Sequence, residues 1–132
     1  MKLMLDTNIC IYIIKQQPPA VLERFQEYLV GDLGISSITL SELRYGVAKS
    51  NYREKNAEAL DEFIMPLEIV PFGEEAALAY GDIRAGLEKA GTPIGAMDML
   101  IAAQALSMGV TLVTNNTREF KRVPGLSIFD WT

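Results

Sequence analysis

The sequence predicts a single α/β domain with a mostly parallel central sheet and helices on both faces. Three observations support this prediction. Short apolar runs that suit buried strands alternate with segments of helical periodicity along the whole chain. The length of 132 residues is that of one domain. No internal repeat or linker-like segment divides the chain, so residues 1–132 are expected to form one domain.

Up to residue 64, two strands and four helices are expected. Each strand is a short apolar run, and each helix repeats apolar side chains every three or four residues. Prolines follow the first helix, a glycine follows the second, and a polar, partly basic turn at 51–55 precedes the fourth. In order, the elements are a strand at Leu3–Leu5, a helix at Ile9–Ile13, a helix at Val21–Leu29, a strand at Leu33–Ser36, a helix at Leu40–Val47 and a helix at Ala57–Ile64.

Beyond Pro66, strands and helices continue to alternate. The longest helix is amphipathic and ends at Gly91, whereas the next is apolar on nearly every side, as expected of a buried helix. Strands joined through helices form parallel sheets by right-handed crossovers. In order, these elements are a strand at Leu67–Val70, a helix at Glu74–Lys89, a helix at Asp98–Leu106, a strand at Val110–Val113, a short helix at Arg118–Lys121 and a strand at Leu126–Phe129.

Composition narrows the possible chemistry. The chain has no histidine, which excludes Ser-His-Asp and Cys-His catalysis and leaves carboxylates, hydroxyls and amides. Cys10 is the only cysteine, so an internal disulfide is excluded, and its apolar neighbours predict a small buried hydrophobe. The net charge of −5 has the wrong sign for binding nucleic acid through the overall field. A nucleic-acid substrate would therefore need metal ions and local basic patches.

The chain shows no signal for a membrane or for export. No apolar run approaches the length of a membrane span, and the residues after Met1 lack the pattern of a signal peptide. A cytoplasmic protein with no membrane contact is therefore expected.

Three acidic residues are placed near the carboxyl ends of the predicted strands. Asp6 follows the first strand, Glu42 lies in the first turn of the helix after the second strand, and Asp98 begins the buried helix. Right-handed crossovers bring Asp6 and Glu42 to one rim of the sheet, whereas topology does not place Asp98. Each acid also has a local interpretation. Asp6 or Asn8 could cap the first helix, Glu42 could form a capping box with Thr39, and Asp98 could complement its helix dipole.

Together the three carboxylates favour a metal site. Clustered carboxylates repel one another and raise each other's pKa unless a cation lies among them. Oxygen ligands without histidine or cysteine suit Mg²⁺ or Mn²⁺, which proteins typically share with a phosphate. Such a site lowers the pKa of bound water and stabilises the oxygens of an in-line phosphoryl displacement. The sequence therefore predicts phosphodiester hydrolysis.

Several motifs in order along the chain carry a resemblance to a known family. They are Met4–Asn8, Ser37–Gly46, Gly91–Ala103 and Leu112–Phe120, followed by Val123–Leu126 and Asp130–Trp131. In these motifs the chain resembles the PIN domain of the VapC toxin family over its whole length. The resemblance implies a Mg²⁺-dependent endoribonuclease, the toxin of a type II toxin–antitoxin system, which is inhibited by a small VapB-type antitoxin.

The resemblance also implies a substrate and an assembly. The expected substrate is tRNA, including initiator tRNA, with rRNA and mRNA as alternatives, and the products carry 5′-phosphate and 3′-hydroxyl ends. The family commonly forms homodimers, places an antitoxin helix in a groove near the site, and binds operator DNA through the antitoxin.

The resemblance assigns roles to the three acids. Asp6, Glu42 and Asp98 match the acidic positions of the family. Asp6 and Asp98 would then ligate Mg²⁺ directly, and Glu42 would ligate through water or orient the attacking water. Residues expected to support the site are Thr7, Asn8 and Thr114.

A fourth acidic position of the family is occupied here by Asn116. Asparagine supplies a neutral oxygen that can hold an outer-shell water but adds no negative charge, so a second metal is left open. Glu119, three residues later, could replace the missing carboxylate or could be a solvated surface acid beside Arg118.

Basic and aromatic side chains near the rim are candidates for substrate contacts. Two clusters, at 49–55 and 118–122, flank the predicted acidic rim, and their principal candidates are Lys49, Arg53, Arg118 and Lys121. Tyr12 and Tyr45 could stack on bases or pack inside the fold, and Arg84 could meet a carboxylate or a partner. The other basic candidates are Lys15, Arg44, Lys55 and Arg122.

The early helices carry much apolar surface, which could belong to the core or to a partner interface. The residues concerned are Ile9, Ile13, Leu22, Phe25, Leu43 and Val47.

Other functions fit less well. A catalytically degenerate PIN-like binding or repression module is the main alternative, and Asn116 is its only support. A phosphoacceptor domain would need adjacent acids and a late lysine, and an aspartyl phosphatase would need an aspartate where Asn8 stands.

Overall fold

A five-stranded parallel sheet runs through the centre of the computed structural model, which describes residues 1–132. The strand order is β3-β2-β1-β4-β5, and every neighbouring pair is parallel, which confirms the predicted α/β class. β2 and β3 lie on one side of β1, whereas β4 and β5 lie on the other side, so the order of the strands reverses at β1. In open α/β sheets, ligands bind outside the carboxyl ends of the strands where the order reverses. The strands are β1 (Leu3–Leu5), β2 (Leu33–Ser36), β3 (Glu68–Val70), β4 (Thr111–Val113) and β5 (Ile128–Phe129).

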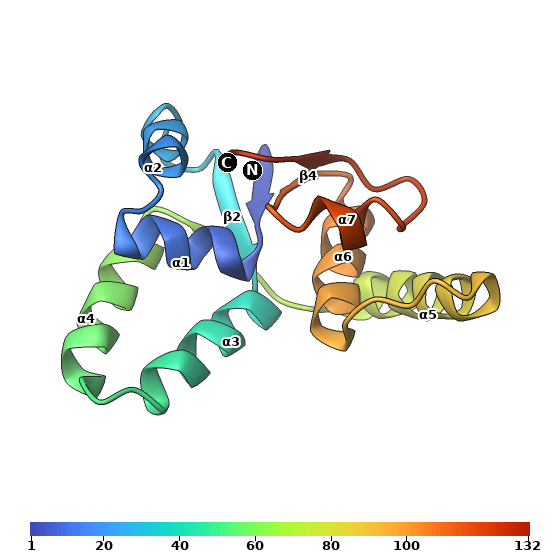
Figure 1. Cartoon of the computed structure of the whole chain (residues 1–132), viewed down its shortest axis with the longest axis horizontal. Helices are drawn as coiled ribbons and strands as arrows, with labels where there is room; N and C mark the ends of the chain where they lie inside the picture. The colour runs from blue at the N-terminus through green and yellow to red at the C-terminus, as the bar shows by residue number, and fades with distance from the viewer.

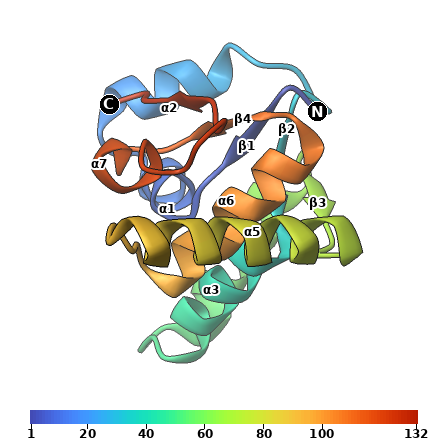
Figure 2. The same cartoon turned by 90° about the vertical axis from the view of Figure 1, so that its right-hand side faces the viewer.

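Seven helices surround the sheet. Figure 1 shows α1, α2 and α4 on one side of the strands and α5 and α6 on the other, with α3 extending away from the strand ends. Figure 2 shows α5 crossing in front of α6. None of these helices combines the length and apolarity needed to cross a membrane. The helices are α1 (Thr7–Lys15), α2 (Pro19–Gln26), α3 (Ser37–Ala48), α4 (Arg53–Ile64), α5 (Glu74–Ala90), α6 (Ala96–Met108) and α7 (Thr117–Phe120).

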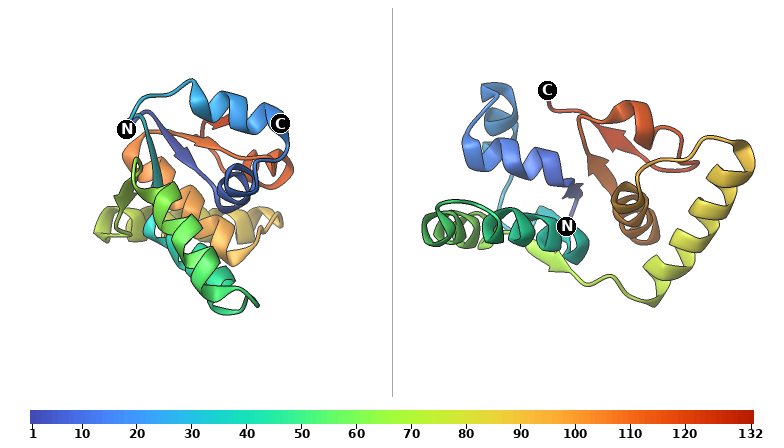
Figure 3. Two further views of the ribbon diagram at one scale, coloured as in Figure 1. Left: turned by 90° about the vertical axis from the view of Figure 1, so that its left-hand side faces the viewer. Right: turned by 60° about the horizontal axis from the view of Figure 1, so that its bottom comes forward.

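The core consists of two clusters, one on each face of the sheet. Met4 belongs to the cluster beneath α5 and α6, and its neighbour Leu5 belongs to the cluster beneath α1 to α4. Successive strand residues point to opposite faces, so β1 contributes to both clusters. Figure 3 shows α1 and α4 on the face opposite α5. Cys10 is fully buried in the second cluster, as predicted.

Most of the apolar surface of the early helices is used inside this fold. Ile9, Ile13 and Leu43 are buried in the second cluster, and Leu22, Phe25 and Val47 pack against it half-buried. The structure therefore favours the core interpretation for these residues.

Most helix boundaries lie one to four residues from the predicted ones, and the differences at the end of α2 and the start of α4 have identifiable causes. α2 ends at Gln26 rather than Leu29, because Tyr28 turns to stack on Trp131 with ring centres 5.6 Å apart and the Leu29 amide donates to the Asp32 carboxylate. α4 begins at Arg53 rather than Ala57, because a polar, exposed first turn has no apolar residue to mark it.

Gly34 allows β2 to lie close to its neighbour strand. A Cβ at this position would lie 2.8 Å from the backbone oxygen of Glu68. Gly34→Ala is therefore expected to lower the free energy of unfolding by about 1–3 kcal/mol, measured by urea denaturation. Gly86→Ala is the control, since a Cβ there meets nothing within 4 Å and alanine favours a helix. Equal stability of Gly34→Ala and the parent would contradict this packing argument.

Candidate active site

Asp6 lies at the carboxyl end of β1, where the strand order reverses. Its amide donates to the Val113 oxygen of β4 at 3.0 Å, which fixes the backbone between the two strands. Its carboxylate accepts a 2.9 Å hydrogen bond from the Ile9 amide and so caps α1. The predicted capping interaction and the predicted position at the rim are thus both present.

Asp6 is only 4% exposed, and this burial is the main influence on the pKa of its carboxyl group. Desolvation raises its pKa from 3.8 to about 6, although hydrogen bonds from the Thr114 side chain and the Ile9 amide oppose the increase. The negative charges of Glu42 and Asp130 raise the pKa further. A buried carboxylate surrounded by like charges is an environment that a cation would stabilise.

Glu42 is held at the same rim by α1. Its carboxylate accepts a 2.5 Å hydrogen bond from the Thr7 hydroxyl, which also lies 3.4 Å from the Thr39 hydroxyl. The alternative interpretation of Glu42, a capping box with Thr39, is not what the structure shows. α3 begins one turn earlier than that box requires, where Ser36 caps the helix by accepting from the Ile38 amide.

Asp98 lies in the first turn of α6 and meets Glu119 of α7. The pKa of Asp98 is raised to about 7, first by burial, then by the hydrogen bond and charge of Glu119, and further by Asp6 and Glu42. The pKa of Glu119 is lowered, chiefly by its hydrogen bond with Asp98 and also by Asn116. Of these two carboxyl groups, Asp98 is therefore the one that holds a proton more readily.

Asn116 organises the side of the site formed by β4 and α7. Its side-chain amide donates to the Glu119 carboxylate at 2.9 Å, and its backbone amide donates to the Thr114 hydroxyl at 2.9 Å. Of the two interpretations of Glu119, the structure places this residue among the acids. We name Asp6, Glu42, Asp98 and Glu119 the acidic cluster.

Two contributions to the site were not anticipated from the sequence. The backbone of Gly95 hydrogen-bonds to Glu119 and helps to lower its pKa. The amide of Asn115 donates to the Tyr12 hydroxyl at 2.8 Å, which ties the loop after β4 to α1. The Gly95 contact uses backbone atoms and the Asn115 contact spans 103 residues, so neither has a signal in the sequence.

The remaining candidates lie on the surface. Tyr45 is 65% exposed rather than packed, and the Lys49 ammonium lies 4.8 Å from its ring centre. Arg44 forms an ion pair with Asp61 at 2.8 Å. Arg84 forms an ion pair with Glu88 at 3.0 Å. Arg122 donates to the Pro93 oxygen at 2.9 Å. Exposed side chains with no side-chain hydrogen bond are Asn8, Lys15, Lys49, Arg53, Lys55, Arg118 and Lys121.

The donor set suits a hard divalent cation, although the side chains are not arranged as a finished coordination sphere. No three acidic side chains lie in a metal-holding arrangement. The raised pKa of Asp98 beside Glu119 reflects a negative charge that a bound cation would offset. All available donors are carboxylate, hydroxyl or amide oxygens, as Mg²⁺ and Mn²⁺ prefer.

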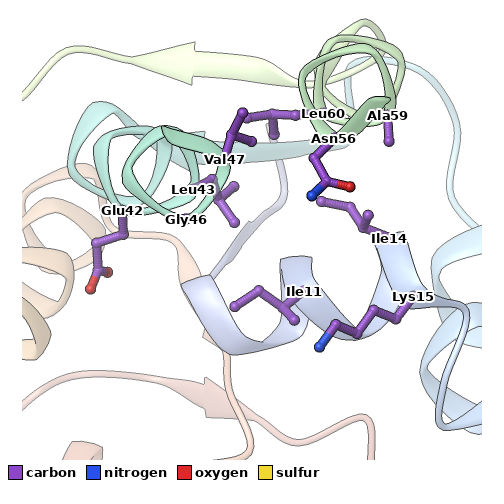
Figure 4. Close-up of a pocket in the computed structure, with 10 residues that line it drawn as sticks. All are labelled: Ile11, Ile14, Lys15, Glu42, Leu43, Gly46, Val47, Asn56, Ala59 and Leu60. Atoms are coloured by element: carbon purple, nitrogen blue, oxygen red, sulfur yellow. The ribbon is translucent and has the colours of Figure 1, made fainter. Parts of the chain in front are cut away.

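An apolar groove lies beside the acidic cluster, between α1, α3 and α4. It has a volume of about 320 Å³. Figure 4 shows Ile11 and Ile14 of α1 facing Leu43 and Val47 of α3, with Glu42 at one end of the groove. The groove therefore joins an apolar surface directly to the candidate active site.

Comparison with known proteins identifies the family. The model of the PIN domain family matches residues 3–126. The "tRNA(fMet)-specific endonuclease VapC" of Salmonella typhimurium is 47% identical over 131 residues, which cover 99% of this chain and 98% of the relative. The chain belongs to the VapC family of PIN-domain proteins. "Ribonuclease VapC2" of Rickettsia felis, another VapC protein, is 44% identical, with 97% of this chain and 96% of the relative covered.

Solved VapC structures share the whole fold. The DNA-bound VapBC of Salmonella typhimurium aligns with a TM-score of 0.94 at 47% identity, covering 100% of this chain and 99% of that chain. VapBC2 of Rickettsia felis, bound to a DNA fragment from its promoter, aligns with a TM-score of 0.93 at 43% identity, covering both chains completely. All four residues of the acidic cluster lie within the matched PIN domain.

Proposed function

We propose that this VapC-family chain is a Mg²⁺-dependent endoribonuclease toxin, with Mn²⁺ able to substitute. The observation that carries the proposal is the acidic cluster at the carboxyl ends of β1, β2 and β4, where burial and mutual repulsion raise the pKa of Asp6 and Asp98. The relatives from Salmonella typhimurium and Shigella flexneri are named as tRNA(fMet)-specific endonucleases, which supports tRNA, and initiator tRNA in particular, as the substrate. Such a substrate favours action in the cytoplasm.

The proposed roles combine the resemblance to the VapC family with the hydrogen bonds at the site. Asp6 and Asp98 would hold the metal, and Glu42 would bind it through water or orient the attacking water, while Thr7 fixes the Glu42 carboxylate by a hydrogen bond. Asn116 fixes Glu119 and the outer shell of the site. A bound Mg²⁺ polarises the phosphate and lowers the pKa of water. The exposed cations that would contact flanking phosphates are Lys49, Arg53, Arg118 and Lys121.

The experiment is cleavage of total tRNA by the purified protein with Mg²⁺ or Mn²⁺, with and without EDTA. Discrete products that require the metal and carry 5′-phosphate ends support the proposal. Complete inactivity of the folded, antitoxin-free protein with either metal would instead support a degenerate binding or repression module, which Asn116 in place of an acid favours.

The inhibitor is proposed to be a VapB-type antitoxin seated in the apolar groove. The structures aligned above are VapBC complexes bound to DNA, which supports an antitoxin partner and, through it, operator DNA. The groove ends at Glu42, so a helix lying in it reaches the acidic cluster. A homodimer of this chain is also proposed, because the VapC family that it resembles commonly forms homodimers.

A larger side chain on α3 that fills the apolar groove tests whether the antitoxin binds there. A Cβ at Gly46 meets nothing within 4 Å, so Gly46→Leu should fold normally and occupy the groove. We expect at least a tenfold weaker affinity for the antitoxin, about 1.4 kcal/mol, with tRNA cleavage unchanged. Calorimetry with the purified antitoxin measures the affinity. Gly86→Leu on α5 is the matched control, since its site is equally open and lies away from the groove. Equal affinity for both variants would place the antitoxin elsewhere.

A further inference from the structure

A row of side chains on α3 extends from the acidic cluster along the helix surface. Tyr45 lies three residues beyond Glu42, and Lys49, the C-cap residue of α3 with a helical backbone conformation, lies seven residues beyond it. Residues at these spacings share one face of a helix, so Glu42, Tyr45 and Lys49 form a continuous row. With a rise of 1.5 Å per residue, the row covers about 10 Å of helix length, starting at the site.

Tyr45 in this row exposes an aromatic ring against which a nucleotide base can stack. The Lys49 ammonium lies 4.8 Å from the ring centre and steadies the ring by a cation–π contact. The Tyr45 side chain is 65% exposed and makes no hydrogen bond with another side chain. Lys49 has no ion-pair partner within 4 Å, so its charge is free for an anion. An exposed aromatic ring beside a free cation matches the way proteins bind an unpaired nucleotide, by base stacking and phosphate contact.

Beyond Glu42, which also lines the apolar groove, the row lies outside that groove. The groove is lined from α3 by Glu42, Leu43, Gly46 and Val47, and neither Tyr45 nor Lys49 takes part. Figure 1 shows α3 and its connection to α4 projecting away from the sheet. The chemistry of this row, aromatic and cationic, complements a polyanion, whereas the groove complements an apolar helix.

We propose that Tyr45 and Lys49 form a stacking site for one unpaired base of the RNA substrate and its phosphate, so that the enzyme receives a single-stranded segment along α3. Inside an RNA duplex, bases are stacked on each other and cannot lie against Tyr45, so paired RNA gains nothing from this site. The proposal deepens the proposed nuclease function and rests on it, because Glu42 is taken as part of the site.

Binding without turnover tests the proposal independently of cleavage. In an Asp98→Asn background, the affinity for a short labelled single-stranded oligoribonucleotide is measured by fluorescence anisotropy. Tyr45→Ala is expected to weaken binding about fivefold to 100-fold, and Tyr45→Phe, which keeps the ring, to bind like the parent. Affinity for a duplex of the same length should not change. Tyr52→Ala is the matched control, because Tyr52 is also exposed, at 71%, but lies outside the row.

Three results would overturn the proposal. One is equal binding by the Tyr45→Ala and Tyr52→Ala variants. Another is an equal loss for duplex and single strand, which would indicate a general electrostatic effect. A third is unchanged RNA binding with weakened antitoxin binding, which would assign the row to the antitoxin. In the active background, Tyr45→Ala should raise KM with little change in kcat. If the parent binds RNA but never cleaves it, the nuclease function fails while the stacking site stands.

Discussion

Replacing Asp6 by asparagine is expected to lower kcat/KM for tRNA cleavage by at least about 10³-fold. The substitution removes a charged metal ligand, and a metal ion contributes several kcal/mol of transition-state stabilisation. A loss of about 4 kcal/mol corresponds to about 10³-fold in rate. Initial rates with labelled tRNA at saturating Mg²⁺ give the comparison.

The same variant should be as stable as the parent or more stable, which separates a catalytic effect from unfolding. Asparagine also accepts hydrogen bonds at a helix N-cap, so the contact with the Ile9 amide can persist. The substitution also removes a buried charge whose pKa is raised to about 6. In metal-free buffer at pH 7.5, we expect the free energy of unfolding to rise by about 1–3 kcal/mol.

Asp82→Asn is the control for this experiment. Asp82 is an exposed acid of α5 and takes no part in the acidic cluster, so its removal should change neither rate nor stability appreciably. Retention of a tenth or more of the parent rate by Asp6→Asn would remove Asp6 from the proposed machinery. A variant that lost both activity and stability would indicate a structural role instead.

The fold was predictable because its signals are local. The short apolar runs at Leu3–Leu5 and Leu33–Ser36 became β1 and β2 without a shift of boundary. The boundaries that failed depend on distant residues or lack apolar markers. Tyr28 leaves the helical pattern to stack on Trp131, more than 100 residues away, and no local rule contains that contact.

The acidic cluster was predictable only in part, for the same reason. Strand ends and crossover handedness place Asp6 and Glu42 near one rim. The partner of the Glu42 carboxylate depends on the packing of α1 against α3, which brings Thr7 within 2.5 Å and displaces the local capping box. The sequence left two interpretations of Glu119 open. This residue meets Asp98 only because α7 lies beside α6 in the fold, and that arrangement has no local signal in the sequence.

The metal-free protein is expected to lose stability as the pH rises from about 4 to about 7, the reverse of ordinary acid denaturation. The pKa of Asp6 is about 6 and that of Asp98 is about 7 in the fold, against 3.8 for both when unfolded. Between these values the folded state binds more protons than the unfolded state, so the free energy of unfolding falls with rising pH. For Asp6 alone, two pKa units correspond to about 3 kcal/mol.

Thermal unfolding in EDTA at pH 5 and pH 8, with urea denaturation for the free energies, measures this effect. Asp98→Asn should flatten the pH dependence, because it removes a carboxyl group whose pKa is raised to about 7, whereas Asp82→Asn should leave it unchanged. Saturating Mg²⁺ should raise the melting temperature more at pH 8 than at pH 5, because a cation binds the ionised carboxylates and competes with their protons. A parent protein that is equally stable at both pH values, or that gains the same from Mg²⁺ at each, would show that these carboxyl groups are not charge-coupled. The pH dependence therefore tests the charge coupling that underlies the proposed metal site, without any measurement of catalysis.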